Sequence, residues 1–319
     1  MDRTPERIGL GLAALGRPGY ITLGHGDDLG ADRSPDALEA NAHAVLDEAW
    51  AGGVRAFDAA RSYGRAEAFL ASWLQRRGLM PGDVRVSSKW GYTYTAAWRV
   101  DAEVHEVKEH AIDVFERQWR ESESLLGRHL TLYQVHSLTL DSPLWGDRAL
   151  LSALARLRDR GVEVGVSTSG AEQAATIERA LALEFDGVPL VRALQTTWNL
   201  LEPSAEDALA AAHARGVRVI VKEALANGRL TDRDRSDATA PLRAEAARLG
   251  CSPDALALAA TCAQPWADTV LSGATTVEQL RSNLRAVAVA VDEATLARLA
   301  SMALPGRRYW SERSQLPWN

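Results

Sequence analysis

The sequence predicts an α/β protein, a single-domain (β/α)8 TIM barrel over residues 1–319. A glycine followed by valine and a short apolar run recurs at Gly53-Val54, Gly161-Val162 and Gly216-Val217. Glycine suits the C-terminal cap of a helix, and β-branched valine favours the start of a strand. Between these joins, apolar residues repeat with the period of a helix. Eight strand–helix units in 319 residues fit a barrel, which typically takes about 250 residues plus insertions, better than a doubly wound sheet of about five or six strands.

Each element follows from these patterns in chain order. The expected strands are Ile8–Leu15, Val54–Asp58, Val84–Lys89, Leu132–His136, Val162–Ser167, Leu194–Thr197, Val217–Lys222 and Thr269–Leu271. The expected helices are Ser34–Trp50, Arg65–Arg76, Lys108–Leu126, Leu150–Arg160, Ala171–Leu183, Ala205–Arg215, Leu242–Ala263 (broken at Gly250 and Pro253) and Val277–Val287. An insertion loop at about 90–106 and a C-terminal tail at about 304–319 are expected to lie outside the eight units.

Composition narrows the class of protein. The 36 Lys+Arg and 42 Asp+Glu give a net charge of −6, with no basic cluster suited to nucleic acid. No apolar run approaches the roughly 18 residues that span a bilayer, and the N-terminus lacks the apolar region of a signal peptide. Two cysteines, Cys251 and Cys262, make no disulfide framework. We expect a cytoplasmic protein that acts on small molecules.

Polar residues stand at the C-terminal ends of the expected strands. In a barrel the active site lies at the C-terminal ends of the strands, so these side chains are expected to converge. Tyr63 follows the second strand by five residues and is placed to fold over the same end. The polar residues at the strand ends are Asp58, Lys89, His136, Ser167, Gln195 and Lys222.

Four of these residues carry a family resemblance. Asp58 and Tyr63 stand in Asp-x-x-x-x-Tyr-Gly, Lys89 in Ser-Ser-Lys-Trp and His136 in Tyr-Gln-Val-His. In this order, at these strand ends, they resemble the aldo-keto reductases, and the resemblance runs from Ile8 to Asn283. It implies an oxidoreductase that interconverts an aldehyde or ketone and its alcohol with NAD(P)(H).

The chemistry of the four residues agrees with that activity. Carbonyl reduction needs a proton for the developing alkoxide, and a free tyrosine with a pKa near about 10 gives it up poorly at neutral pH. We expect Lys89, held by Asp58, to lower the pKa of Tyr63, which acts as the general acid and base. His136 is expected to orient the carbonyl or to assist the proton transfer.

The resemblance also implies a set of cofactor contacts. Ser167 and Gln195 match positions that hold the nicotinamide carboxamide, and Lys222–Leu230 resembles the segment that covers the pyrophosphate. The strand, loop and helix start over Val270–Asn283 resemble the adenosine-phosphate segment. The expected cofactor-binding residues are Ser167, Gln195, Lys222, Leu225, Gly228, Arg229, Gly273, Thr275, Gln279 and Asn283.

The cofactor is expected to be NADP(H) rather than NAD(H), with Thr275, Thr276 and Arg281 near the 2′-phosphate. Two departures from the family pattern bear on it. Lys222 replaces an aromatic residue expected against the nicotinamide, and Gly273-Ala274 replaces a Lys-Ser pair that often binds the 2′-phosphate.

Aromatic residues of the insertion are expected to line the substrate pocket, namely Trp90, Tyr92 and Trp98, with Tyr94 nearby. Arg308, Tyr309 and Trp310 of the tail are expected to form a second wall. Aromatic faces with polar edges suit a sugar-like or aryl ligand.

Other interpretations stay open. A redox-silent isomerase, lyase or cyclase would use Tyr63, Lys89 and His136 for proton transfer without net hydride loss. A non-enzymatic cofactor-binding subunit is the second alternative, and the complete set of four residues argues against it. The G-x-G-x-x-A run at Gly9–Ala14 is not preceded by a full strand, and Pro18-Gly19 interrupts the helix that a dinucleotide fingerprint requires. The seven histidines show no zinc-ligand spacing, so no metal is expected.

Overall fold

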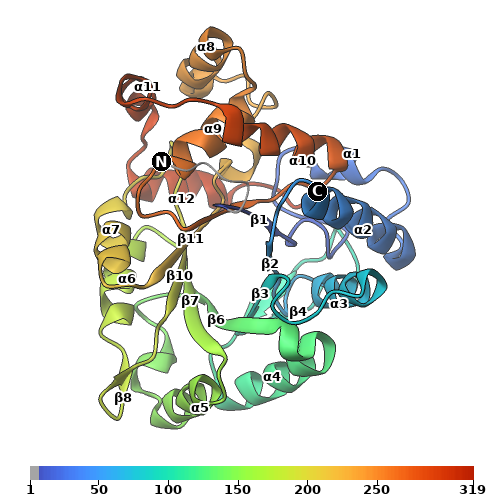
Figure 1. Ribbon diagram of the computed structural model, residues 1–319, viewed down its shortest axis with the longest axis vertical. Coiled ribbons are helices and arrows are strands. Elements are labelled where there is room, and N and C mark those ends of the chain that lie inside the picture. The colour runs from blue at the N-terminus through green and yellow to red at the C-terminus, as the bar shows by residue number, and fades with distance from the viewer. Residues whose placement is uncertain (1–6) are drawn as a thin grey trace.

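Eight parallel strands close into a barrel in chain order, which confirms the predicted fold (Figure 1). The computed structural model describes residues 7–319, so the N-terminal segment 1–6, on which the absence of a signal peptide was argued, lies outside the described residues. The barrel strands are β1 (Ile8–Gly11), β2 (Ala56–Asp58), β3 (Arg85–Trp90), β6 (Leu130–Leu138), β7 (Glu163–Thr168), β10 (Ala193–Thr197), β11 (Arg218–Lys222) and β12 (Thr269–Ser272).

Helices surround the barrel and cover its outer face (Figure 1). Those of the repeating units are α2 (Pro35–Ala51), α3 (Ala66–Arg77), α4 (Ile112–Leu126), α5 (Arg148–Asp159), α6 (Gln173–Leu181), α7 (Glu206–Ala214), α8 (Ala240–Leu249), α9 (Pro253–Cys262) and α10 (Val277–Leu284). Short 3₁₀ turns lie at Gly127–His129, Pro143–Gly146, Ala226–Gly228, Asp237–Thr239, Arg285–Ala288 and Ala300–Met302.

The break between α8 and α9 and the end of β1 show how local residues determine where helices and strands end. Gly250 ends α8 in the left-handed conformation, with φ 68°, and Pro253 starts α9 one residue after its Ser252 cap. The predicted break is therefore confirmed. β1 ends at Gly11 rather than Leu15, because the chain turns back at Leu12, and the Gly16 amide donates to the Leu12 carbonyl at 3.2 Å.

Several elements were not predicted. They are α1 (His25–Leu29), the hairpin β4–β5 (Tyr92–Tyr94 and Glu106–Lys108), the hairpin β8–β9 (Glu184–Phe185 and Val188–Pro189), α11 (Glu293–Leu299) and α12 (Gly306–Ser314). The β4–β5 hairpin forms the predicted insertion, and it extends two residues further, so that the third predicted helix begins at Ile112 instead of Lys108.

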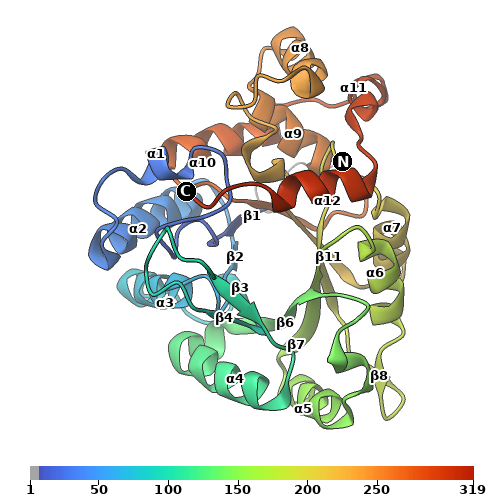
Figure 2. The same cartoon turned by 180° about the vertical axis from the view of Figure 1, so that it is seen from behind.

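α12 and the C-terminal tail lie across the end of the barrel at which the strands finish (Figure 2). The tail is joined to the loop after β1, because Tyr20 and Asn319 exchange two backbone hydrogen bonds of 3.2 Å. The same loop reaches the segment after β11 through the Leu23 amide, which donates to the Asn227 carbonyl at 3.0 Å. Three segments far apart in sequence therefore meet around the barrel mouth.

The interior of the barrel is partly filled by a small apolar cluster from four different strands, Leu132, Ala193, Ile220 and Leu271. A much larger apolar cluster packs the strands against the helices. Over residues 7–319, no helix combines the length and apolar character needed to cross a membrane.

Candidate active site

A cavity of about 710 Å³ opens at the mouth of the barrel. Asp58, Tyr63 and His136 line it, and Lys89 lies just beneath with its side chain fully buried. The barrel thus brings the four predicted catalytic residues together from β2, the loop after it, β3 and β6. The strand register produces this meeting, since Asp58 pairs with Ser87 on β3 and Lys89 with Gln134 on β6.

Asp58 and Lys89 form a buried ion pair, with Nζ 2.5 Å from Oδ2. Lys89 also donates to the Ala59 carbonyl at 2.7 Å. The second carboxylate oxygen of Asp58 accepts hydrogen bonds from Ser87 at 2.7 Å, Gln195 at 2.9 Å and Gln134 at 3.3 Å. Both charges are therefore paired and hydrogen-bonded, which a buried ion pair requires. Burial lowers the pKa of Lys89, and Asp58 partly offsets the effect.

Tyr63 lies over this pair, with the Lys89 ammonium 4.8 Å from its ring centroid. Contrary to the expectation from sequence, the pKa of Tyr63 is not lowered. Burial raises it well above 10, and the negative charge of Asp58 adds to the effect. The phenol stays protonated at neutral pH because the site excludes water and favours the uncharged form.

His136 faces Tyr63 edge-on, with ring centroids 5.5 Å apart, and only 8% of its surface is exposed. Burial lowers the pKa of His136 well below 6.5, and the cations Lys89 and Lys222 lower it further. The imidazole is therefore neutral at physiological pH. A neutral imidazole has one N–H donor for a substrate oxygen, which fits the predicted orienting role.

Arg17 is a site residue that the sequence reasoning missed. Its guanidinium lies 5.2 Å from the Tyr63 ring centroid and 4.7 Å from that of Trp318. It donates to the Ser62 carbonyl at 3.0 Å and forms an ion pair with Glu106 of the β4–β5 hairpin. Arg17 follows β1, so the same strand-end argument that found Asp58 applied to it.

The tail contributes Trp318 rather than the residues predicted from it. Trp318 lines the cavity and stacks on His105 with the rings 7° from parallel and their centroids 3.9 Å apart. Arg308, Tyr309 and Trp310 lie outside the cavity lining. The chain has ten tryptophans against four phenylalanines. This excess is a signal for such a residue, but it does not indicate which one.

Only one of the predicted substrate contacts lies at the cavity, Tyr92. Trp90 is fully buried and packs against Phe115 of α4, with ring centroids 5.0 Å apart. The indole of Trp98 donates to the Arg33 carbonyl at 2.8 Å and is also outside the cavity lining. Trp90 follows Lys89 in β3, and successive side chains of a strand point to opposite faces, so Trp90 faces the helices.

Most predicted cofactor residues line the cavity, namely Gln195, Lys222, Leu225, Gly228, Gly273, Gln279 and Asn283. Three do not. The Ser167 hydroxyl is buried and accepts from the Ser137 amide at 2.8 Å. Arg229 points to α12 and pairs with Glu312 at 2.9 Å. Thr275 is buried, and its hydroxyl lies 3.3 Å from His25 Nδ1.

A second charged group lies at the end of β11. Lys222 donates to the Thr197 hydroxyl at 2.6 Å, and Glu223 pairs with Arg313 of α12, whose Nε lies 2.9 Å away. Burial alone would raise the pKa of Glu223, but Arg313 and Lys222 outweigh it and lower that pKa to about 2. Burial lowers the pKa of Lys222 to about 8.

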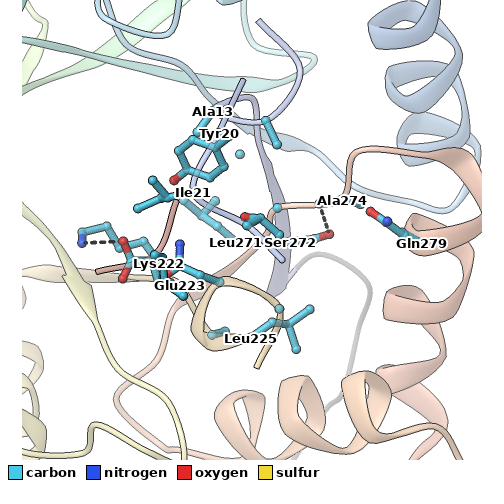
Figure 3. A pocket seen from close by; sticks show the side chains of 18 of the residues that line it. Ala13, Tyr20, Ile21, Lys222, Glu223, Leu225, Leu271, Ser272, Ala274 and Gln279 are labelled. Atoms are coloured by element: carbon cyan, nitrogen blue, oxygen red, sulfur yellow. Dashed lines mark hydrogen bonds and ion pairs between the residues drawn. The ribbon is translucent and has the colours of Figure 1, made fainter. Parts of the chain in front are cut away.

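The cavity fits a dinucleotide in extent and in polarity. It runs from the predicted catalytic residues to the start of α10, and Figure 3 shows Lys222 and Glu223 at one side with Ala274 and Gln279 at the other. Asn227 lines the cavity on the intervening segment and is 7% exposed, and within residues 7–319 its buried Oδ1 has no hydrogen-bond partner. A buried acceptor without a partner is costly. Within residues 7–319 no group of His, Cys, Asp or Glu is arranged to hold a metal.

Comparisons with known proteins agree with this geometry. A model of the aldo/keto reductase family matches residues 7–303. Protein tas of Escherichia coli strain K12 and protein tas of Shigella flexneri are each 26% identical to the chain, over 83% of it and 89% of their own length. The holo form of aldo-keto reductase AKR11C1 from Bacillus halodurans has the same fold, with a TM-score of 0.66, 19% identity, and coverage of 94% of this chain and 92% of that one.

Proposed function

This chain belongs to the aldo/keto reductase family, whose members are generally NAD(P)H-dependent oxidoreductases, and on that premise we propose that it reduces an aldehyde or ketone to its alcohol, with Tyr63 as the proton donor. The observation that carries the proposal is the meeting of Asp58, Tyr63, Lys89 and His136 at the floor of one cavity large enough for a dinucleotide. Each residue has a role that its surroundings define.

His136 binds the carbonyl oxygen. Its neutral imidazole donates one hydrogen bond, which fixes the direction from which the carbonyl is approached. Tyr63 stands beside it and donates its phenolic proton to the same oxygen as negative charge develops there. A bound nicotinamide would supply the hydride to the carbonyl carbon and be oxidised in the step.

Lys89 and Arg17 stabilise the phenolate that remains on Tyr63. Their cationic groups lie 4.8 Å and 5.2 Å from the ring centroid, and both are buried, so water screens them little. Asp58 holds Lys89 in place through its Oδ2 atom. The phenolate then recovers a proton from solvent when the product leaves and the cavity opens to water.

Tyr63 can serve the reaction in either direction. Burial keeps its phenol protonated at neutral pH, so the resting residue holds the proton that carbonyl reduction consumes. The cations Lys89 and Arg17 stabilise the phenolate that forms, and the same residue accepts a proton when the alcohol is oxidised.

The substrate proposed is a sugar-like or aryl carbonyl compound. Tyr20, Tyr92 and Trp318 supply aromatic faces around the catalytic residues, and Arg17 with Glu106 supplies polar groups at the same wall. Rings stack on such faces while hydroxyls bond to the polar groups. The partners are small molecules, and a cytoplasmic location remains our expectation from the sequence.

The choice between NADP(H) and NAD(H) is part of the proposal. The argument for NADP(H) depended on Thr275, Thr276 and Arg281 lying near a 2′-phosphate. Thr275 is turned away from the cavity, and both Nε and Nη2 of Arg281 bind Glu48 of α2, at 2.9 and 2.8 Å. Thr275 and Arg281 therefore do not offer the 2′-phosphate contacts on which the expected NADP(H) preference depended.

Turnover with a panel of aldoses, aryl aldehydes and simple ketones tests the proposal. With either NADH or NADPH present, we expect loss of the reduced-nicotinamide absorbance with stoichiometric formation of alcohol. Conversion of a substrate without any change in that absorbance would support the redox-silent alternative. Cofactor binding without turnover of any compound would support the non-enzymatic one.

A further inference from the structure

We infer that the chain selects NAD(H) over NADP(H), an inference that rests on the proposed nicotinamide chemistry. The evidence lies in the α10 corner of the cavity, which is formed by Asp254, Gly273, Ala274, Glu278, Gln279, Ser282 and Asn283. The nicotinamide must lie near Tyr63, at the opposite end, so the adenosine half of the cofactor reaches this corner.

The charges of the α10 corner suit ribose hydroxyls and oppose a phosphate. Its ionisable side chains are the carboxylates Asp254 and Glu278, and the corner has no lysine or arginine. Carboxylates accept hydrogen bonds from the 2′-hydroxyl of NAD, whereas the 2′-phosphate of NADP is usually held by an arginine. A phosphate brings up to about two negative charges at neutral pH, which both carboxylates would repel.

Basic residues elsewhere around the cavity are already paired with acids. Arg17 pairs with Glu106, Arg233 with Asp28, Arg313 with Glu223, and Lys222 lies 3.8 Å from Glu223. Arg281, the basic residue of α10 itself, makes two hydrogen bonds to Glu48 on α2 and does not line the cavity. Recruiting Arg281 to a phosphate would break that pair.

Three backbone donors around the start of α10 are already occupied. The Ala274 amide donates to Ser272 Oγ at 3.3 Å, and the Thr275 amide donates to Gln279 Oε1 at 2.8 Å. The Gln279 amide donates in turn to Thr276 Oγ1 at 3.2 Å. A helix start binds phosphate through amides without intrahelical partners. Because the protein's own side chains satisfy three of these amides, fewer are left for an anion.

The remaining polar groups of the α10 corner are neutral amides. Gln279 and Asn283 line the cavity. Gln279 Oε1 accepts from the Thr275 amide at 2.8 Å, and the Asn283 amide is bonded to Ser272 Oγ at 2.8 Å. The carboxylates, the missing cation and the occupied backbone amides therefore agree on a ribose with both hydroxyls free.

Equilibrium titration of the full chain with NADH and NADPH, followed by quenching of tryptophan fluorescence, tests the inference without any substrate. We expect NADH to bind at least about tenfold more tightly, a difference that two nearby carboxylates and a missing cation readily produce. Adenosine 2′,5′-bisphosphate should compete with NADH less well than 5′-ADP.

A variant designed to gain affinity for NADPH tests the same inference. A side chain at Gly273 would meet no atom within 4 Å, and its backbone conformation is open to any residue. Gly273→Lys should therefore place an ammonium at the α10 corner and raise the affinity for NADPH by about tenfold. Gly146→Lys is the matched control, because Gly146 is equally unobstructed but lies outside the cavity lining. It should change neither affinity.

The outcomes separate this inference from the proposed function. NADPH binding as tightly as NADH, or more tightly, would overturn the NAD(H) selection and leave the reductase proposal intact. A Gly273→Lys variant with no gain for NADPH over the control would also overturn it. If neither nucleotide binds the wild-type chain, the proposed function itself fails.

Discussion

Replacing Lys89 by methionine tests how much the buried ion pair between Asp58 and Lys89 stabilises the fold. Methionine is unbranched and of similar length but carries no ammonium, so packing is largely kept. The change removes the hydrogen bonds to Asp58 and to the Ala59 carbonyl. Asp58, only 3% exposed, is then a buried carboxylate with neutral donors alone.

The expected cost is about 3 kcal/mol in the free energy of unfolding. Breaking a buried ion pair by removing one partner costs about 3–5 kcal/mol, and Asp58 keeps its bonds to Ser87, Gln134 and Gln195, which favours the lower end of that range. Activity should also fall severely, because the phenolate of Tyr63 loses its closest cation.

Urea unfolding followed by tryptophan fluorescence measures the loss, and a double-mutant cycle attributes it. Asp58→Asn combined with Lys89→Met removes both charges of this pair, so the double variant should be more stable than the sum of the two single losses predicts, by about 2 kcal/mol or more. A loss below about 1 kcal/mol for Lys89→Met, or strictly additive losses, would refute the reasoning.

Three further predictions concern pH, the substrate wall and the β11 end. The pH profile of kcat/KM for reduction should show no inflection near pH 6.5, because burial lowers the pKa of His136. It should also show none below about pH 10, because burial raises the pKa of Tyr63. A step in either range would contradict the protonation states assigned to these two residues. Trp318→Ala should raise KM for the carbonyl substrate several-fold, whereas Trp98→Ala, outside the cavity lining, should leave KM unchanged; equal effects would remove Trp318 from the substrate wall. Glu223 is buried, yet flanking cations lower its pKa to about 2, so it stabilises the fold above its usual pKa of 4.5 and loses that contribution as the pH falls toward 2. Glu223→Gln should therefore lower the unfolding midpoint at pH 7 much more than at pH 3; an equal loss at both would contradict the pairing.

The barrel and the residues proposed to be catalytic were predictable because their signals are local. A strand in a barrel ends at the catalytic face, so a polar residue at that end is placed by its position in the strand. Asp58, Lys89 and His136 were found in this way. The outward position of Trp90 was predictable on the same grounds, since its side chain alternates with that of Lys89 along the strand. The prediction that Trp90 lines the substrate pocket was wrong because it followed the aromatic character of the residue instead of this alternation.

The rest of the site could not be found from local patterns, because loops far apart in the sequence form it. Arg17, Glu106 and Trp318 meet over Tyr63 from the loop after β1, the β4–β5 hairpin and the last residues of the chain. The protonation of Tyr63 depends on the water that these segments together exclude. Short motifs predict the nearby cation Lys89, but the degree of burial, which decides the pKa, follows only from the assembled mouth.

The most direct test of the central claim is single-turnover reduction by Tyr63→Phe, with the best carbonyl substrate from the panel. The substitution removes one oxygen, so the fold and the affinity for nicotinamide nucleotide should match the wild type when measured by tryptophan fluorescence. The rate of hydride transfer should fall by a factor of about 100 to 10,000, the usual contribution of a positioned acid. A variant that binds cofactor normally and keeps a near wild-type rate would show that Tyr63 is not the proton donor.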